Sequence, residues 1–369
     1  MTNPEQTLTR VRLEKDGVEV HWSDGHRALF HHLWLRHSPG FPGAARPAGP
    51  EGRFPRDAKP VSAVDASVDA EGDLQIDWSD GRQSRHQADW LRANDYGAGA
   101  HARRRRPVTS WTAASIQDRP AFDYAALRDD ERARLGLIEQ LLDFGVARLI
   151  NVPASETTVT EVGDWFGHRP TNLYSDDPGQ PTICNIRIDP RVPVATSQCH
   201  FLGPHTDTCW RQTLIGLLLM HCLKAHPEGG RSIVVDGFAV AERLREQDRE
   251  AFDLLARVPL DFGSRVSDSD EWRVLGRVIS VAADGVIEGI RYNGNSIGQL
   301  DLPAELIEPT YRALEAFDSI LFDREFWWQP LLQPGDLLIY DNHRVLHGRE
   351  AFDPTLGERH LQCCAVDRD

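Results

Sequence analysis

The chain has 369 residues, of which 40% are hydrophobic and 26% charged, so it is long enough for one large globular domain and a smaller one. Its 56 acidic and 41 basic residues give a net charge of −15, which argues against nucleic acid as a partner, because phosphate binding needs a basic face. The most apolar run, residues 214–220, is far shorter than the ~20 residues of a membrane span, so we expect no membrane association.

The N-terminal residues 1–10 contain no apolar segment of the kind that a secretory signal requires. Six cysteines lie between residues 184 and 364, and none belongs to a Cys-x-x-Cys pair. We therefore expect a cytoplasmic protein whose cysteines are free thiols.

The first hundred residues contain an internal repeat. Residues 22–25 read Trp-Ser-Asp-Gly and recur at 78–81, and each copy is followed by Trp-Leu-Arg, at 34–36 and 90–92. An alternating pattern typical of a strand precedes each Asp-Gly, which supplies the positive φ of a tight hairpin turn. We expect residues 1–100 to form a small β-rich domain, followed by a larger domain that spans the remainder, 101–369.

The second domain mixes short strands with a few helices. Apolar periodicity predicts helices at residues 127–144, 239–255 and 303–320. Strand-like runs follow the first helix and continue to the C-terminal part of the domain, at residues 146–152, 182–188, 212–223, 231–235, 277–282, 336–340 and 360–366. Many short strands with Gly and Pro turns favour a β-barrel or sandwich with helical decoration.

A candidate metal site begins with His205 and Asp207, which project from the same face if the segment is a strand. His343 and His347 offer a third ligand. Two histidines and one carboxylate leave three positions open on an octahedral metal, as in non-haem Fe(II) oxygenases. The alternative is a strand end with a surface carboxylate. His221 lies in an apolar run and is interpreted as a core histidine.

Arg359 follows His347 by twelve residues, and its planar guanidinium can bind a carboxylate through two hydrogen bonds. If the intervening strands are antiparallel, Arg359 faces the barrel interior and suits a dicarboxylic cosubstrate that chelates the metal at its other end. Ser232 begins a strand after two glycines, and its hydroxyl could donate to the same carboxylate. A surface salt bridge and an ordinary strand serine are the alternatives for these two residues.

Taken in order, these motifs resemble the γ-butyrobetaine hydroxylase and trimethyllysine dioxygenase branch of the taurine-dioxygenase-like (TauD/TfdA) superfamily. The resemblance implies a mainly β fold, with a double-stranded β-helix (jelly-roll) core decorated by helices and preceded by the small accessory domain. The matching stretches are residues 78–81, the two Trp-Leu-Arg segments, 205–207, 221–223, 229–232, 235–238, 292–293, 334–336, 341–349 and 359–362.

The resemblance also implies an Fe(II)- and 2-oxoglutarate-dependent dioxygenase. His205, Asp207 and His347 would ligate the iron, which selects one of the two histidines left open above. Arg359 and Ser232 would bind 2-oxoglutarate. Members of this branch often dimerise, so a homodimer is compatible with the resemblance.

The chain departs from the family in its accessory domain. Relatives commonly bind zinc there through three closely spaced cysteines and one histidine. Here no cysteine follows residues 34–36, and Arg82 stands where the family often has histidine. We therefore predict no zinc in this domain.

The chain also departs from the family in its substrate pocket, where betaine-binding members hold a quaternary ammonium in an aromatic cage. Cys184, Ala195 and Ala365 occupy the cage positions, and Trp210 is the aromatic residue that remains nearby. The same region is rich in polar and cationic residues that could contact substrate; the alternative is that they belong to a solvated surface loop. They are Asn185, Arg187, Arg191, Gln198, His200, Arg211 and, by resemblance, Asn293. This composition favours a small polar or anionic metabolite as substrate.

The expected reaction is hydroxylation of an unactivated C–H bond with O₂ and 2-oxoglutarate, giving succinate and CO₂ as co-products. Asp207 argues against halogenation, because related halogenases carry a small residue in its place. Desaturation or oxidative cleavage stay open. Three other functions also stay open: a non-catalytic relative that binds metal and 2-oxoglutarate, a γ-butyrobetaine-like hydroxylase with a remodelled pocket, and a zinc hydrolase.

Overall fold

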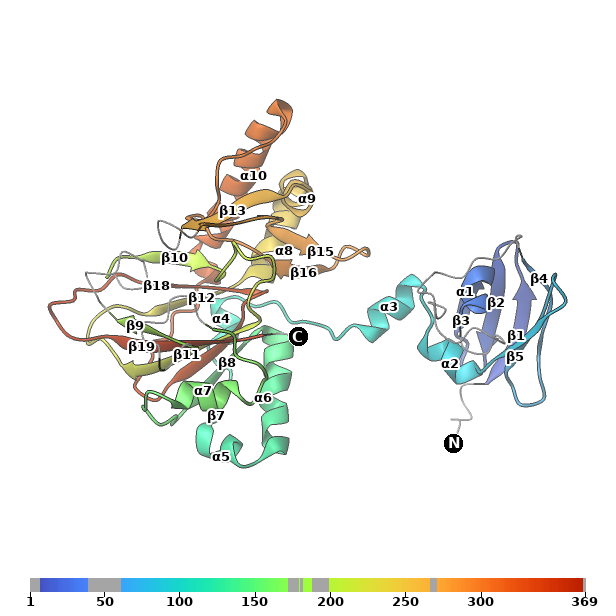
Figure 1. Ribbon diagram of the computed structural model, residues 1–369, viewed down its shortest axis with the longest axis horizontal. Helices are drawn as coiled ribbons and strands as arrows, with labels where there is room; N and C mark the ends of the chain where they lie inside the picture. The colour runs from blue at the N-terminus through green and yellow to red at the C-terminus, as the bar shows by residue number, and fades with distance from the viewer. Residues whose placement is uncertain are drawn as a thin grey trace. The chain divides into compact units, whose positions relative to one another are not determined.

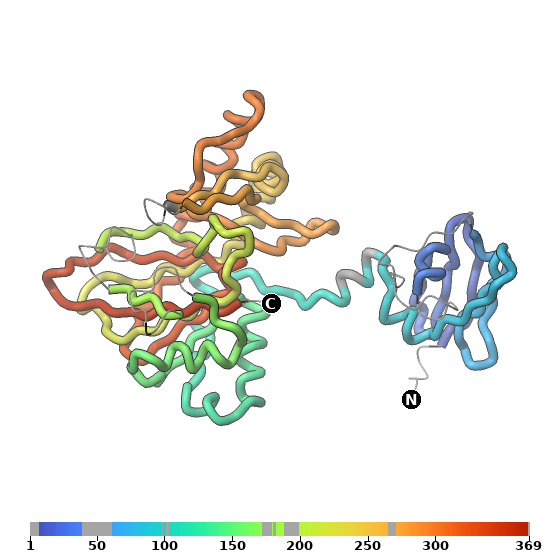
Figure 2. The backbone as a smooth tube through the Cα atoms, viewed as in Figure 1, coloured from blue at the N-terminus to red at the C-terminus, as the bar shows by residue number. Residues whose placement is uncertain are grey.

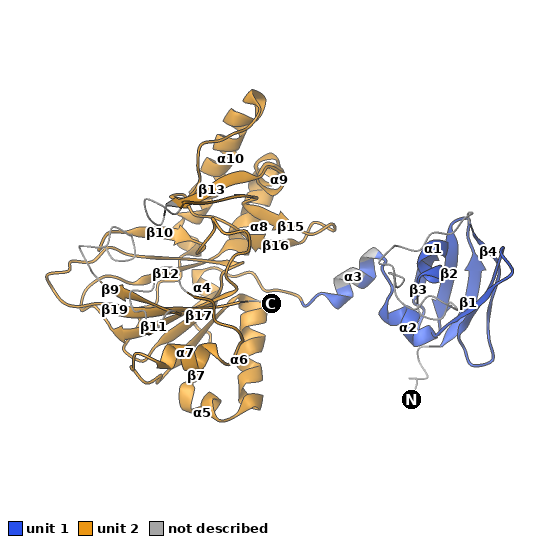
Figure 3. Cartoon of the chain, in the orientation of Figure 1, with its two compact units in different colours: residues 1–106 blue, residues 107–369 orange. Residues whose placement is uncertain are grey.

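The chain divides into two compact units, residues 1–106 and 107–369, which are described separately below (Figure 3). The expected boundary at residue 100 falls within helix α3 (Ala98–Arg104). The computed structural model describes residues 7–38, 61–171, 179, 182–187, 199–265 and 271–367.

The smaller unit contains two three-stranded sheets, each followed by a short helix. The first consists of β1 (Leu8–Leu13), β2 (Gly17–Trp22) and β3 (Arg27–His31), with α1 (His32–Arg36) after it. The second consists of β4 (Ala63–Val68), β5 (Leu74–Trp78) and β6 (Gln83–His86), with α2 (Ala88–Ala93) after it.

The internal repeat predicted for this unit is confirmed as two copies of strand, turn, strand and helix. Trp22 and Trp78 end equivalent strands and are both 2% exposed. Gly25 and Gly81 adopt φ values of +83° and +81°, which a side chain with a Cβ rarely tolerates and which the hairpin turns require. The two tryptophans share one apolar core between the sheets.

The larger unit is built on two facing sheets. A six-stranded sheet has the order β7 (Phe122–Asp123), β8 (Val146–Ile150), β17 (Leu337–Asp341), β11 (Leu217–Lys224), β19 (His360–Val366), β9 (Ile183–Arg187). A three-stranded sheet has the order β10 (Leu202–His205), β18 (Val345–Arg349), β12 (Ser232–Asp236). Apart from the short parallel pair β7–β8, the neighbouring strands of these two sheets are antiparallel. The unit has a double-stranded β-helix core.

Strand alternation separates three apolar layers in this unit. Along β17, Leu338 and Tyr340 face the space between the sheets, whereas Leu337 and Ile339 face outward. The outer face of the larger sheet is covered by α5 (Tyr124–Arg128), α6 (Glu131–Phe144) and α7 (Thr158–Gly163). The outer face of the smaller sheet packs against α8 (Gly237–Gln247), α9 (Arg249–Arg257) and α10 (Ala304–Leu321) (Figures 1 and 2).

The remaining elements are short. They are α4 (Ala113–Ile116), the 3₁₀ turn η3 (Arg324–Phe326) and two hairpins, β13 (Leu260–Arg265) with β14 (Glu271–Gly276) and β15 (Ile279–Val281) with β16 (Ile287–Ile290). No helix in the described part of the chain is long and apolar enough to cross a membrane.

The predicted elements differ from the structure at several places. The helix predicted at residues 127–144 begins only at Glu131, where the Asp130 carboxylate caps α6, and residues 127–128 belong to α5. The helix predicted at residues 239–255 is interrupted at Asp248, whose carboxylate caps α9 by accepting a hydrogen bond from the Ala251 amide at 2.9 Å. The strand predicted from residue 212 begins only at Leu217, because the preceding residues form a loop. The β13–β14 hairpin was not predicted. The strand predicted at 360–366 is confirmed as β19.

Candidate active site

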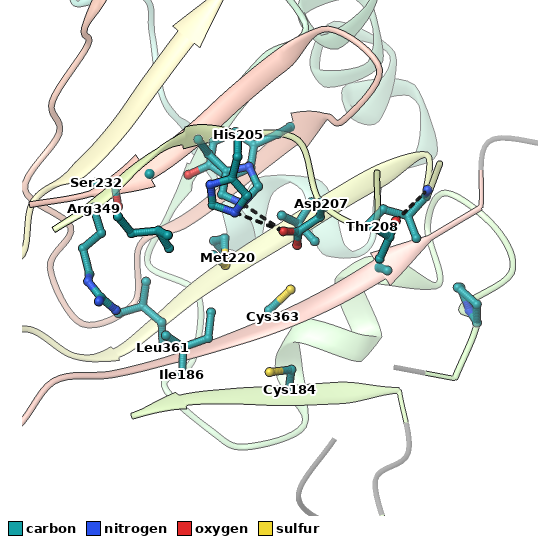
Figure 4. Close-up of a pocket in the computed structure, with 18 of the residues that line it drawn as sticks. Cys184, Ile186, His205, Asp207, Thr208, Met220, Ser232, Arg349, Leu361 and Cys363 are labelled. Carbon is teal, nitrogen blue, oxygen red and sulfur yellow. Dashed lines mark hydrogen bonds and ion pairs between the residues drawn. The ribbon is translucent and has the colours of Figure 1, made fainter. Parts of the chain in front are cut away.

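Three potential metal ligands converge at one edge of the smaller sheet. His205, the last residue of β10, lies directly opposite His347 of β18. Asp207 follows two residues later, and its Oδ1 is 3.3 Å from Nε2 of His205 and 3.6 Å from Nε2 of His347 (Figure 4). One ligand atom from each side chain lies within 4.8 Å of the others. Within the described ranges, no other three His, Cys, Asp or Glu residues cluster in this way.

The surroundings of His347 and Asp207 favour the protonation states that a divalent metal requires, whereas at His205 the contact with Asp207 outweighs burial and raises the pKa. Burial lowers the pKa of His347 to about 4, so its imidazole is neutral at pH 7. Burial by itself would raise the pKa of Asp207, but the adjacent His347 and His205 keep it below the ordinary value. The Nδ1 atom of His205 lies 2.9 Å from the Gly203 carbonyl. A carbonyl only accepts, so Nδ1 carries a proton, and Nε2, which faces Asp207, is the ring nitrogen that a metal would bind.

The ligand group forms part of the wall of a cavity between the two sheets (Figure 4). Ser232 and Arg349, opposite each other in the β12–β18 pair, line one side of this cavity, and Arg359 lies in the same wall. Tyr340 stacks on His347 with the ring centroids 5.4 Å apart. Apolar side chains complete this part of the lining and exclude water: Ile186, Leu202, Leu218, Met220 and Leu361.

Arg359 is a buried cation without a carboxylate partner among the described residues. It is 8% exposed, and its Nε donates to the Gly230 carbonyl at 3.2 Å. Burial, followed by repulsion from Arg349, lowers its pKa to about 10, so it is still a cation at pH 7. An uncompensated buried charge costs several kcal/mol. This position therefore suits the carboxylate of a ligand.

On the other side of the cavity, beyond Asp207, several of the side chains that line it are small. Cys184 and Cys363 face each other across β9 and β19, and Ala365 lies two residues further along β19. Thr208 and Arg211 complete this side from the loop after Asp207, and no carboxylate among the described residues pairs with Arg211. The remaining lining residues here are Pro170, Thr171 and Ile215.

Five residues predicted to contact substrate lie outside the described cavity lining. Asn185 and Arg187 alternate with the inward-facing residues of β9, and Asn185 Oδ1 accepts hydrogen bonds from His360 and Gln362 on β19. Because successive strand side chains face opposite ways, these residues point away from the cavity.

The other three are held elsewhere. Trp210 is buried against Trp272, with ring centroids 5.6 Å apart. His200 is exposed, and its carbonyl accepts from Arg349. Asn293 accepts from the amide of Asn295 in a turn. Two further candidates, residues 191 and 198, lie outside the described residues.

Sequence reasoning did not assign Arg349 to the site. The signal was available, because Arg349 follows His347 by two residues on the same strand and therefore shares its face. Arg211 was identified only as one of several cations near the motif. Its position in the cavity lining depends on the conformation of a loop, which the periodicity of apolar residues cannot predict.

Comparison with known proteins decides the family. Residues 104–365 match the model of the family described as taurine catabolism dioxygenase TauD, TfdA family. The chain belongs to the TauD/TfdA family. It is 31% identical over 360 residues to the γ-butyrobetaine dioxygenase of Pseudomonas sp. (strain AK-1), covering 96% of this chain and 91% of that protein. It is 29% identical over 305 residues to the mitochondrial trimethyllysine dioxygenase of Bos taurus, covering 80% and 70% of the two chains.

Solved structures agree on the TauD/TfdA fold. An asparagine oxygenase in complex with Fe(II), 3-hydroxyasparagine and succinate superposes with a TM-score of 0.54 at 17% identity, over 66% of this chain and 80% of that one. The chain is an Fe(II)- and 2-oxoglutarate-dependent dioxygenase, and its His, Asp, His group fits an Fe(II) ion in both ligand type and spacing.

Proposed function

We propose that His205, Asp207 and His347 hold the Fe(II) and that Arg359 and Ser232 bind the distal carboxylate of 2-oxoglutarate. The enzyme then hydroxylates an unactivated C–H bond of a small polar or anionic metabolite, with succinate and CO₂ as co-products. One observation carries this proposal: the three ligands and an unpaired buried guanidinium line the same cavity.

Each side chain has a defined task in this scheme. When bound, iron and 2-oxoglutarate supply the oxidising chemistry that activates O₂. The Gly203 carbonyl fixes the tautomer of His205, so its Nε2 is aimed at the metal position. Arg359 orients the cosubstrate by charge and hydrogen-bond geometry. Leu218, Met220 and the other apolar lining residues exclude water, which strengthens these polar contacts.

The substrate class follows from the side of the cavity beyond Asp207. Two relatives are named for γ-butyrobetaine and trimethyllysine, which carry quaternary ammonium groups. Here the described lining presents thiols, Ala365 and the cation Arg211, and its one aromatic residue, Tyr340, stacks on His347. A quaternary ammonium gains no cation–π contact from these groups and is repelled by Arg211. A γ-butyrobetaine-like substrate is the second candidate, since 31% identity to such an enzyme favours it.

Two subsidiary proposals concern the rest of the chain. All six cysteines are free, which supports a reducing compartment such as the cytoplasm. We also propose that the smaller unit binds no zinc. In support, the buried His86 is hydrogen-bonded to Ser84 at 3.0 Å, and Ser84 accepts from the Trp78 indole at 2.9 Å.

Anaerobic titration of the protein with Fe(II) and 2-oxoglutarate tests the proposed site, because the metal–cosubstrate pair gives a visible charge-transfer band. We expect the band in the wild type and its loss in His347→Ala. In Arg359→Ala we expect roughly 10–150-fold more cosubstrate for half-saturation, the equivalent of a charged hydrogen bond of about 1.5–3 kcal/mol.

Matched controls separate these effects from general damage. His343→Ala removes a histidine of the same segment that is absent from the described cavity lining, and Arg187→Ala removes an exposed arginine on β9. Both should titrate like the wild type. A wild type without a band would overturn the proposed function. If the site is established, consumption of 2-oxoglutarate with small carboxylates, amino acids and γ-butyrobetaine then separates the two substrate candidates.

A further inference from the structure

The carboxylate ligand stands where its strand has left the sheet. The β10–β18 ladder pairs His205 with His347, and its continuation would place Asp207 opposite Val345. Instead, the amide of Thr206 donates to the Tyr292 carbonyl at 2.7 Å, outside this sheet. Asp207 therefore receives no backbone hydrogen bond from β18, and its position must be fixed by other groups.

Asn342 supplies the missing partner. This residue follows β17, is fully buried, and accepts a hydrogen bond from the Asp207 amide at 2.8 Å through Oδ1. Its Nδ2 donates to the carbonyls of Asp207 at 3.1 Å and Ile215 at 3.3 Å. One side chain thus satisfies both backbone groups of Asp207, in the way that a neighbouring strand would.

The backbone after Asp207 is strained and needs such a clamp. Thr208 has a φ of +53°, which is rare for a β-branched residue and costs about 1–3 kcal/mol. A conformation of this kind persists only where the surroundings impose it. Asn342 contributes on both sides of the loop, because its own amide also donates to the Gly216 carbonyl at 2.9 Å.

We propose that Asn342 is a positioning residue for the metal centre, holding the Asp207 carboxylate at the distance that joint coordination with His205 and His347 requires. This inference rests on the proposed metal site. Asn342 lies in the turn between β17 and β18, so the turn that leads into the strand of His347 also fixes the carboxylate ligand. β18 carries His347 and pairs with His205, and the turn before it holds Asp207, so the positions of all three ligands depend on this turn and strand.

A matched pair of variants tests the proposal. Asn342→Leu keeps the number and branching of the side-chain heavy atoms and removes three hydrogen bonds to the loop. Arg291→Met also removes three, from Arg291 to the carbonyls of Cys209, Arg211 and Gln212, without touching Asp207. Loss of a group that orients a ligand typically weakens metal binding 10–100-fold. We expect Asn342→Leu to raise the Fe(II) dissociation constant by roughly this factor, with a displaced charge-transfer band, and Arg291→Met to stay within about threefold of the wild type.

The thermal unfolding of each metal-free protein is measured together with the titration. Metal affinities are then compared between variants of similar stability. If Asn342→Leu does not fold, Asn342→Ser decides, since it removes the clamp with a smaller, polar side chain. Wild-type metal affinity in a folded Asn342 variant would overturn the proposal. Equal losses in Asn342→Leu and Arg291→Met would also overturn it, because the effect would then belong to the loop as a whole. A wild type that binds no Fe(II) would overturn the proposed function itself.

Discussion

Burial has opposite consequences for two ionisable residues of the larger unit. Arg359 stays charged although it is buried and lies near Arg349, so it favours an anionic ligand. His221, on the outward face of β11, is fully buried, and burial lowers its pKa from 6.5 to about 4. It stays neutral in the folded protein and needs no ligand, which agrees with its interpretation as a core histidine.

The pKa of His221 predicts a pH-dependent stability. The unfolded chain binds a proton at this residue below pH 6.5, whereas the folded chain does so only near pH 4. Stability is therefore lost as the pH falls through this window, by about 2 kcal/mol at pH 5 from this residue. Urea unfolding at pH 7.5 and 5 should show a smaller decrease for His221→Leu than for the wild type. His200→Leu, which removes an exposed imidazole, should keep the wild-type decrease, and an unchanged decrease in His221→Leu would contradict the prediction.

At the scale of elements, one buried ion pair joins the β17–β18 turn to the start of α8. Arg344 donates to both oxygens of Asp236, at 2.9 and 2.8 Å, and the two residues are 2% and 0% exposed. Arg344 also donates to the carbonyls of Asp143 and Thr109, while Asp236 accepts from the amide of Trp111. The pair thus connects the turn before β18, the strand of His347, with the segment that precedes α4.

Breaking this pair from one side should be costly. Arg344→Met leaves a buried carboxylate without its cation, and we expect it to reduce the free energy of unfolding by about 3–5 kcal/mol. Asp236→Asn should restore part of this loss in the double variant, because the remaining group is neutral. Urea unfolding of the two single variants and the double variant completes a mutant cycle. Additive losses would show that the two residues act independently.

The elements that could be predicted from the sequence are those whose pattern is local. β19 and α10 follow from apolar runs with clear ends. The HxD pair was expected to share one face of a strand, but β10 ends at His205, so Asp207 reaches the site from the loop that follows. The break at Asp248 was missed because the apolar periodicity continues across it, although the Asp248 side chain caps the start of a new helix. The cavity wall was predicted poorly: Asn185 and Arg187 are polar, but the register of β9 against β19 turns them outward.

At the scale of the whole molecule, the two units carry separate cores. The described residues that line the cavity all lie in residues 107–369, and the buried cluster around Trp22 and Trp78 contains only residues of the smaller unit. We therefore expect damage to the smaller core to leave the metal site intact.

Trp78→Ala tests this independence. Removal of a buried tryptophan should destabilise the smaller unit by about 3–5 kcal/mol. The Fe(II) dissociation constant should stay within about threefold of the wild type, since Trp78 belongs to the core of the smaller unit. Calorimetry and the charge-transfer titration measure the two effects on the same sample. A parallel loss of metal affinity would show that the units are energetically coupled.

The order of strands in the larger sheet has a consequence for how the protein is made. β19 lies between β11 and β9, yet its residues leave the ribosome long after both partners. Until then β11 and β9 each present an unpaired edge. β10 likewise lacks its partner until β18 has been synthesised. Such edges favour association with other chains. Synthesis of this protein therefore includes a long interval of exposure, in which chaperone capacity should limit the yield of active enzyme more than the final stability does.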